Sequence, residues 1–112
     1  MRRGEIWTVS GGADYAGKPR PGVILQDDRF DATSSITVCL FTTDETEAPL
    51  FRVPVSPDGA NGLRPACRIM VDKIVTVPKT RMGTRIGHLD RVSQGQLNQS
   101  VLVFLGLVGS RE

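Results

Sequence analysis

The stretch ITVCLFT, residues 36–42, decides the fold because it is the most strand-like segment in the chain. It is rich in β-branched, aromatic and other apolar residues, a composition typical of strands. Shorter segments of the same character lie on both sides of it, and Pro54 in one of them favours an edge strand or a bulge. The expected strands are residues 5–9 (EIWTV), 21–26 (PGVILQ), 36–42, 50–55 (LFRVPV), 66–72, 74–77 and 85–89. The continuous apolar run in residues 21–26 indicates a strand buried on both sides.

The segments between these strands carry turn signals, and only the C-terminus predicts a helix. Residues 27–31 read as a turn or one helical turn, and SPDG at 56–59 precedes Asn61-Gly62. At residue 93 a capping box begins, with Ser93 as N-cap and Gln96 three residues later, and Val92 and Leu97 are placed to form a hydrophobic staple. Apolar residues then recur at helical spacing. Many short strands and one terminal helix predict a mainly β (β+α) protein, a small barrel with a helix packed on it.

Size and composition exclude several classes of protein. The 112 residues, 39% hydrophobic and 23% charged, are typical of one ordinary globular domain, residues 1–112. No apolar run approaches the roughly 18 residues needed to cross a bilayer. The opening MRRGEIW lacks the apolar core of a signal peptide, so we expect a cytoplasmic protein. Cys39 and Cys67 are expected to be reduced, mostly buried thiols, and a single histidine gives no metal-binding pattern.

The net charge of +2 is small, but the positive charge is concentrated in one part of the chain. Residues 63–91 hold seven Lys or Arg residues against two aspartates. A basic segment on a near-neutral chain fits a polyanionic partner, and it equally fits solvated charges on strand faces.

Arg20 is the residue that the local sequence singles out. It lies between Pro19 and Pro21 at the start of a buried strand. Proline fixes its own φ and drives the preceding residue towards extended conformations, so Arg20 is held stiffly. A pre-organised guanidinium suits bidentate recognition of a phosphate or carboxylate, although an exposed arginine at a strand start is the simpler interpretation. His88 as a catalyst, and a metal site among Asp44, Glu45 and Glu47, are weaker candidates.

Several short motifs resemble those of the MazF/PemK-type toxins of bacterial toxin–antitoxin pairs, in the same order and at similar spacing. They cover nearly the whole chain and are RGEIW at residues 3–7, GKPRPGVIL at 17–25, VCLFTT at 38–43, and a segment at 63–82 that contains Asp72-Lys73-Ile74 and Arg81-Met82.

The resemblance implies a CcdB/PemK fold, which is an SH3-like barrel with a C-terminal helix, assembled as a homodimer. It implies a toxin that cleaves single-stranded RNA (mRNA) at short sequences, needs neither a metal nor any other cofactor, and is held inactive by a cognate antitoxin. The family's catalytic arginine maps onto Arg20 and its catalytic threonine onto Thr42, and an aspartate used in the related Kid toxin maps onto Asp72. Family members often carry Glu or His about five residues before the arginine, where this chain has Asp14 or Tyr15.

Metal-free RNA cleavage uses the 2′-OH of the substrate as nucleophile, and it leaves a 2′,3′-cyclic phosphate and a 5′-OH. The site must move protons and stabilise a phosphorane. Arg20 suits the phosphorane, Thr42 can hydrogen-bond a phosphate oxygen or the 2′-OH, and Asp14 and Asp72 are the candidate bases. The expected RNA-binding residues are Lys18, Tyr15, Thr43, Arg64, Arg68, Lys73 and Lys79, and Phe30 is a further candidate to stack on a base.

Two other functions compete with the nuclease. A CcdB-like toxin would poison DNA gyrase through its C-terminal helix, but this helix lacks the tryptophan expected for that mode. A plain SH3-like interaction module would make the basic segment incidental.

Overall fold

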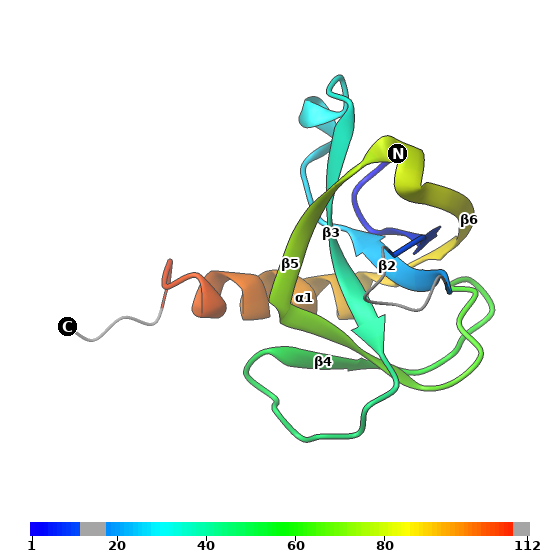
Figure 1. The fold of residues 1–112 in the computed structure, drawn as a ribbon. Coiled ribbons are helices and arrows are strands. Elements are labelled where there is room, and N and C mark those ends of the chain that lie inside the picture. Colours follow the sequence, from blue (N-terminus) through cyan, green and yellow to red (C-terminus); the bar gives the residue numbers. More distant parts are fainter. Residues whose placement is uncertain (12–17, 109–112) are drawn as a thin grey trace.

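The computed structural model describes residues 1–11 and 18–108 and shows a six-stranded sheet with one α-helix against it (Figure 1). Neighbouring strands are antiparallel in the order β4-β5-β3-β2-β1-β6. The strands are β1 (Glu5–Val9), β2 (Arg20–Ile24), β3 (Ser35–Thr42), β4 (Arg52–Val55), β5 (Cys67–Pro78) and β6 (Met82–His88). Two short 3-10 helices, η2 (Asp28–Phe30) and η3 (Lys79–Arg81), and the helix α1 (Arg91–Phe104) complete the described elements. The predicted mainly β architecture is confirmed.

Strand β3 is buried on both of its faces, which explains its unbroken apolar sequence. Its even-numbered residues Ile36, Val38 and Leu40 belong to one buried cluster, whereas Cys39 and Phe41 belong to a second. Strand β2 is built the same way, with Val23 in one cluster and Ile24 in the other, so the predicted two-sided burial is confirmed. Because successive side chains of a strand point to opposite faces, each apolar residue fills one side of the sheet or the other.

The two strands expected at residues 66–72 and 74–77 form the single long strand β5, so their separation was wrong. Ile74 lies opposite Cys39 of β3, but Ile69 lies opposite Phe41, so β5 carries extra residues in the middle of the ladder. Such an insertion bends a strand and increases its twist without ending it. Figure 1 shows β5 changing direction midway along its length. Asp72 and Lys73 lie in this bend, and their polarity is what made the sequence read as two strands.

Strand β4 lies at the edge of the sheet, as Pro54 predicted. Pro54 lies opposite Arg68 of β5 and is solvent-exposed, so its missing N–H costs no hydrogen bond inside the sheet. The helix α1 contacts β4 and β5, and Leu97 is the helix residue that is buried in the core. Within the described residues, no helix has the length and hydrophobicity that crossing a bilayer requires.

The start of α1 differs from the prediction. The N-cap is Asp90 rather than Ser93, because the Asp90 carboxylate accepts a hydrogen bond from the Ser93 backbone N–H at 2.9 Å. Aspartate caps a helix as well as serine does, because its side-chain oxygen accepts from an otherwise unpaired N–H of the first turn. The cap at Asp90 therefore makes the helix begin earlier than predicted. Val92, the expected staple residue, is 68% exposed, so no staple with Leu97 forms.

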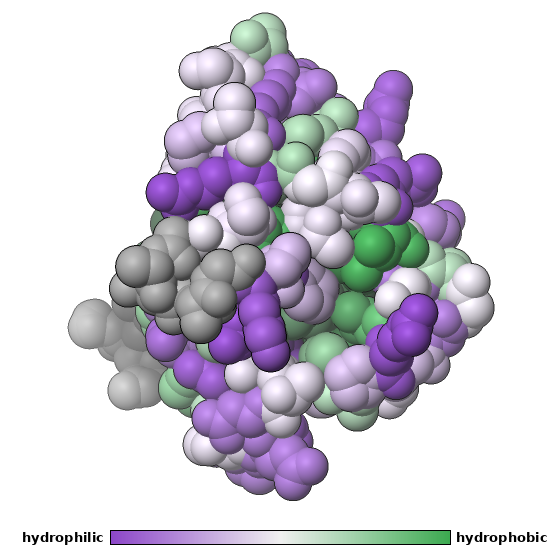
Figure 2. All heavy atoms as spheres, turned by 45° about the vertical axis from the view of Figure 1, so that its right-hand side comes forward, coloured by the Kyte–Doolittle hydropathy of each residue, from purple (hydrophilic) through white to green (hydrophobic). Residues whose placement is uncertain are grey.

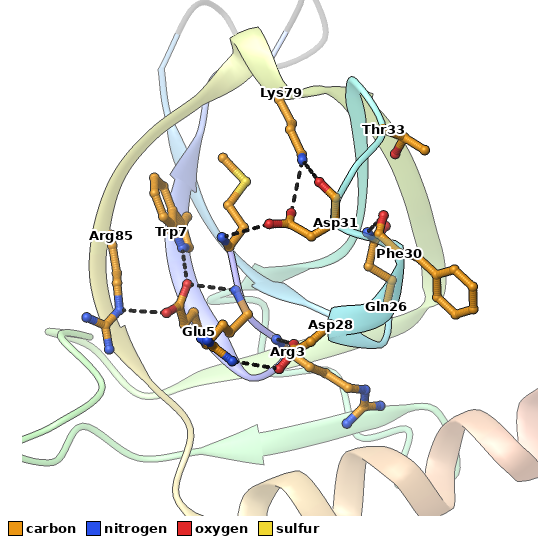
Figure 3. Close-up of polar contacts among 12 residues, drawn as sticks. Arg3, Glu5, Trp7, Gln26, Asp28, Phe30, Asp31, Thr33, Lys79 and Arg85 are labelled. Atoms are coloured by element: carbon orange, nitrogen blue, oxygen red, sulfur yellow. Dashed lines mark hydrogen bonds and ion pairs between the residues drawn. The ribbon is translucent and has the colours of Figure 1, made fainter.

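The RGEIW opening fastens the N-terminal strand to its neighbours (Figure 3). One Glu5 carboxylate oxygen accepts hydrogen bonds from the Arg2 backbone N–H and the Trp7 indole N–H, both at 3.0 Å, and the other lies 3.4 Å from Arg85 on β6. Arg3 donates to the Leu25 carbonyl at 2.6 Å. Burial tends to raise the pKa of Glu5, but these donors and the Arg85 cation outweigh it and lower the pKa. The charged motif therefore has a structural role in this fold.

Truncating Leu97 should detach the helix from the sheet, because this side chain is 1% exposed and fills the core. We expect Leu97→Ala to lower the free energy of unfolding by about 2–5 kcal/mol. The matched variant Val92→Ala should change it by less than about 0.5 kcal/mol, since Val92 is on the surface. Urea unfolding followed by circular dichroism measures both. A comparable loss in the two variants would contradict the helix register described above.

Candidate active site

A pocket of about 650 Å³ lies at the end of the sheet where β2 begins and β3 stops. Its walls combine apolar side chains with a few basic and hydroxyl groups. Figure 2, which brings the right-hand side of Figure 1 forward, shows apolar residues in green between hydrophilic residues in purple on this face. The lining residues are Lys18, Pro19, Arg20, Pro21, Phe41, Thr42, Thr43, Gly62, Leu63, Arg64, Pro65, Cys67 and Ile86.

Arg20 and Thr42, distant in the sequence, come together because of the register between β2 and β3. Gly22 lies opposite Leu40 in this antiparallel ladder, and Arg20 and Thr42 are each two residues further towards the same end of the two strands. Both residues line the pocket. The structure thus brings the two principal predicted site residues into one place.

The Thr42 hydroxyl is oriented by its own loop. Its oxygen accepts a hydrogen bond from the backbone N–H of Asp44 at 3.1 Å. A hydroxyl that accepts one bond in this way keeps its own hydrogen for donation, so Thr42 can donate towards a ligand in the pocket. The loop contact therefore helps to hold the Thr42 hydroxyl oxygen in place.

A rigid loop forms the opposite wall of the pocket. Asn61 is 1% exposed; its side-chain N–H donates to the Ser56 carbonyl at 2.9 Å, and its side-chain oxygen accepts from the Leu63 N–H at 3.0 Å. Gly62 has φ of +72°, and a Cβ there would lie 2.2 Å from the Ile86 carbonyl oxygen, so the loop fits closely on β6 only with glycine. The sequence marked Asn61-Gly62 as a turn but gave no sign that it would border a pocket.

Three cations line the pocket, Lys18, Arg20 and Arg64, and none of the described residues that line it is acidic. Of these three cations, only Arg64 comes from the basic segment at residues 63–91, so the other basic residues of that segment do not line the pocket. Arg68 binds the Asp44 carbonyl and Glu47, and Arg85 pairs with Glu5. The positive character of the pocket therefore arises mainly from the residues flanking the two prolines.

Asp72 is not one of the residues that line the pocket. It forms a bidentate ion pair with Arg52 of β4, with N–O distances of 2.9 and 3.1 Å, and both side chains are largely buried. Hydrogen bonding from the Arg52 guanidinium holds the pKa of the Asp72 carboxyl below its usual range. A lowered pKa makes a carboxylate a weaker base.

The remaining predicted residues divide between the pocket and other places. Thr43 lines the pocket, whereas Lys73 is exposed in the bend of β5. Lys79 lies in an ion pair of 2.9 Å with Asp31 (Figure 3). Phe30 is exposed on η2, and His88 belongs to a separate shallow recess beside α1. Asp14 and Tyr15 lie outside the described residues.

Both cysteines are free and buried, as predicted. Burial raises the pKa of the Cys39 thiol to about 12 and also raises that of Cys67, so both thiols are protonated at neutral pH. The apolar floor of the pocket, which includes Cys67, Phe41 and Leu63, carried no motif that sequence reasoning could have used.

The described structure is a small antiparallel β protein with one helix, and Arg20 and Thr42 line its basic pocket. Residues 2–105 match the family described as PemK-like, MazF-like toxin of type II toxin-antitoxin system, and this chain belongs to that family. A "Probable endoribonuclease MazF" from Mycolicibacterium smegmatis is 47% identical over 97% of this chain and 100% of its own length. "Endoribonuclease MazF9" from Mycobacterium tuberculosis is 29% identical over 96% of this chain and 98% of its own length.

Solved structures share the fold. A mycobacterial "Endoribonuclease in complex with its cognate antitoxin" has a TM-score of 0.80 at 20% identity, over 98% of this chain and 99% of that one. "Mycobacterium tuberculosis toxin MazF-mt6" has a TM-score of 0.77 at 24% identity, over 91% and 96%. The expected CcdB/PemK fold is therefore confirmed.

The Arg52–Asp72 pair predicts a pH-dependent contribution to stability. The folded pKa of Asp72 lies below the unfolded value of about 3.9, so its stabilisation is complete above that pH and is lost as pH falls through the folded pKa. We expect Asp72→Asn to lower the free energy of unfolding by about 1–3 kcal/mol at pH 7 and by much less at pH 3. Urea titrations at both pH values test this, with the exposed Glu45→Gln as control. An equal loss at pH 3 and pH 7 would contradict it.

Proposed function

We propose that this chain is the endoribonuclease of a toxin–antitoxin pair and cleaves single-stranded RNA by attack of a substrate 2′-OH, without a metal. The observation that carries the proposal is the position of Arg20 and Thr42 in one basic pocket. Further support comes from the relative named as a probable endoribonuclease, which matches over nearly the whole chain.

Arg20 would stabilise the phosphorane that forms when the 2′-OH attacks the neighbouring phosphorus. A guanidinium presents several N–H donors in a fixed fork, and this fork matches the non-bridging oxygens of a phosphate. Electrostatic stabilisation is most effective when the donors need not reorganise during the reaction. Pro19 and Pro21, which flank Arg20 in the pocket wall, restrict the backbone and so reduce that reorganisation.

Thr42 would donate its hydrogen bond to a phosphate oxygen or orient the 2′-OH, from a hydroxyl oxygen that its contact with Asp44 helps to hold in place. For the general base, the geometry disfavours Asp72, which is committed to Arg52 and does not line the pocket. Asp14, which precedes Arg20 by a few residues in the sequence, is then the candidate base.

The pocket suits one part of an unpaired RNA strand. Its apolar floor can receive a base, while Lys18 and Arg64 on the rim can bind the phosphates on either side. Of the RNA-binding residues expected from sequence, Lys18, Thr43 and Arg64 are the ones that the geometry favours.

A gyrase-poisoning function is the less favoured alternative. The two relatives matched over nearly their full length carry the name endoribonuclease, and the C-terminal helix of this chain contains no tryptophan. Trapping of gyrase on DNA, together with intact RNA, would reverse this preference.

The purified protein should cleave an end-labelled single-stranded RNA in the presence of EDTA, leaving a 2′,3′-cyclic phosphate and a 5′-OH. Arg20→Ala should slow this cleavage by about 100-fold or more, because loss of one transition-state donor typically has that effect. Arg29→Ala on η2 is the matched control for the removed charge and should cleave at the normal rate. Full activity of a correctly folded Arg20→Ala protein, judged by its melting temperature, would refute the assignment.

We also propose that the chain works in the cytoplasm as a homodimer that a cognate antitoxin inhibits. Support comes from the structural neighbours, which include an endoribonuclease with its cognate antitoxin and a MazE–MazF complex from Deinococcus radiodurans. Sedimentation equilibrium should give twice the 12.2 kDa mass of one chain. Adding the small protein encoded next to this gene should form a larger complex and stop cleavage. A monomer that cleaves RNA at full rate would contradict the dimer.

A further inference from the structure

The loop that follows β3 is tied to the sheet by Arg68, a residue that the sequence assigned to RNA. Arg68 lies directly opposite Thr42 in the ladder between β3 and β5. Its guanidinium donates to the Asp44 carbonyl at 3.1 Å and to the Glu47 carboxylate at 3.0 Å. The Arg68 side chain is 19% exposed, whereas that of Glu47 is 81% exposed, so a mostly buried arginine reaches out to the loop.

Asp44 connects this arginine to the pocket. Its backbone N–H donates to the Thr42 hydroxyl oxygen, and its carbonyl accepts from Arg68. Its carboxylate accepts from the N–H and the hydroxyl of Thr46, at 3.0 and 2.8 Å. All three polar groups of Asp44 are therefore used: Thr42 holds the peptide unit before its Cα, and Arg68 holds the peptide unit after it.

We propose that Arg68 is a positioning residue that sets the hydroxyl of Thr42 through Asp44, with Glu47 holding the guanidinium in place. The proposal rests on the proposed ribonuclease function, because it assigns Thr42 to the reaction. It replaces the expectation that Arg68 binds RNA phosphates, since both ends of its guanidinium are engaged by the loop.

The two roles predict opposite kinetic effects. A positioning residue acts on the chemical step, so its loss lowers kcat and leaves KM nearly unchanged. A phosphate-binding residue contributes to RNA affinity, so its loss raises KM and reduces the slope of log affinity against log salt by about 1. A Glu47 variant also distinguishes the two roles of Arg68. If Arg68 binds RNA, removal of the Glu47 charge should strengthen RNA binding, whereas if Arg68 positions Thr42, the same change should lower kcat.

The experiment measures kcat, KM and salt dependence on an RNA oligonucleotide that the wild-type protein cuts once. For Arg68→Met we expect kcat to fall about 10-fold with KM within twofold, and Arg68→Lys should recover part of the rate. Glu47→Gln should lower kcat about threefold without lowering KM. The controls are Arg29→Met and Asp27→Asn, which remove the same charges as Arg68→Met and Glu47→Gln. Arg29 and Asp27 form an ion pair of 3.0 Å at η2, and neither residue lines the pocket. Both controls should behave as wild type.

A structural readout keeps this inference separate from the proposed function. Three-bond NMR couplings report the χ1 angle of Thr42, which we expect to be a single rotamer in the wild type and averaged in Arg68→Met. This readout does not need activity: if the wild type cleaves no RNA, the proposed function fails while an averaged Thr42 still supports the positioning. An unchanged Thr42 rotamer in Arg68→Met overturns the inference, as does a raised KM with kcat unchanged.

Discussion

Burial of β3 on both of its faces is the constraint on which the rest of the structure depends. A strand that places Val38 on one side and Phe41 on the other needs apolar cover above and below, so the sheet must curve around it. That cover includes Leu97 of α1 on the Phe41 side and Val9 of β1 on the Val38 side, and the neighbouring strand β5 bends at the residues inserted opposite Leu40. A shift of one residue in register would exchange the side chains between the two faces and disrupt the packing of both clusters, so the register is strongly fixed.

The same register produces the pocket. Because β2 begins beside the end of β3, the first residue of β2, Arg20, and the last residue of β3, Thr42, lie at the same end of the sheet and line the pocket. The loop of Asn61 and Gly62 closes the other side by fitting onto Ile86 of β6. The site is thus formed by strand ends and rigid loops, which position groups with little reorganisation. Charge is distributed in a similar way, since a carboxylate outside the pocket, such as that of Asp72, pairs with a cation of its own, Arg52.

The sequence alone was most informative where a residue type has one physical meaning. Pro54 indicated an edge strand, the apolar runs indicated two-sided burial, and Pro19 and Pro21 pointed to a fixed Arg20. It was misleading where several residues can do the same work. Asp90 caps α1 as well as Ser93 could, so the helix begins earlier, and a polar bend in β5 looked like a break between strands. Arg68, Lys73 and Lys79 show a similar limit, because a positive charge in sequence does not reveal whether an internal carboxylate already holds it.

The mainly β class and the terminal helix were therefore determined by the sequence, because local conformational preference and hydrophobic pattern decide them. Only the tertiary structure decided that Arg20 and Thr42 line one pocket, that Asp72 belongs to Arg52, and that Arg68 faces the loop of Asp44. These are relations between residues far apart in the chain. They depend on register and on the competition among charges for partners, and neither can be read from any one segment.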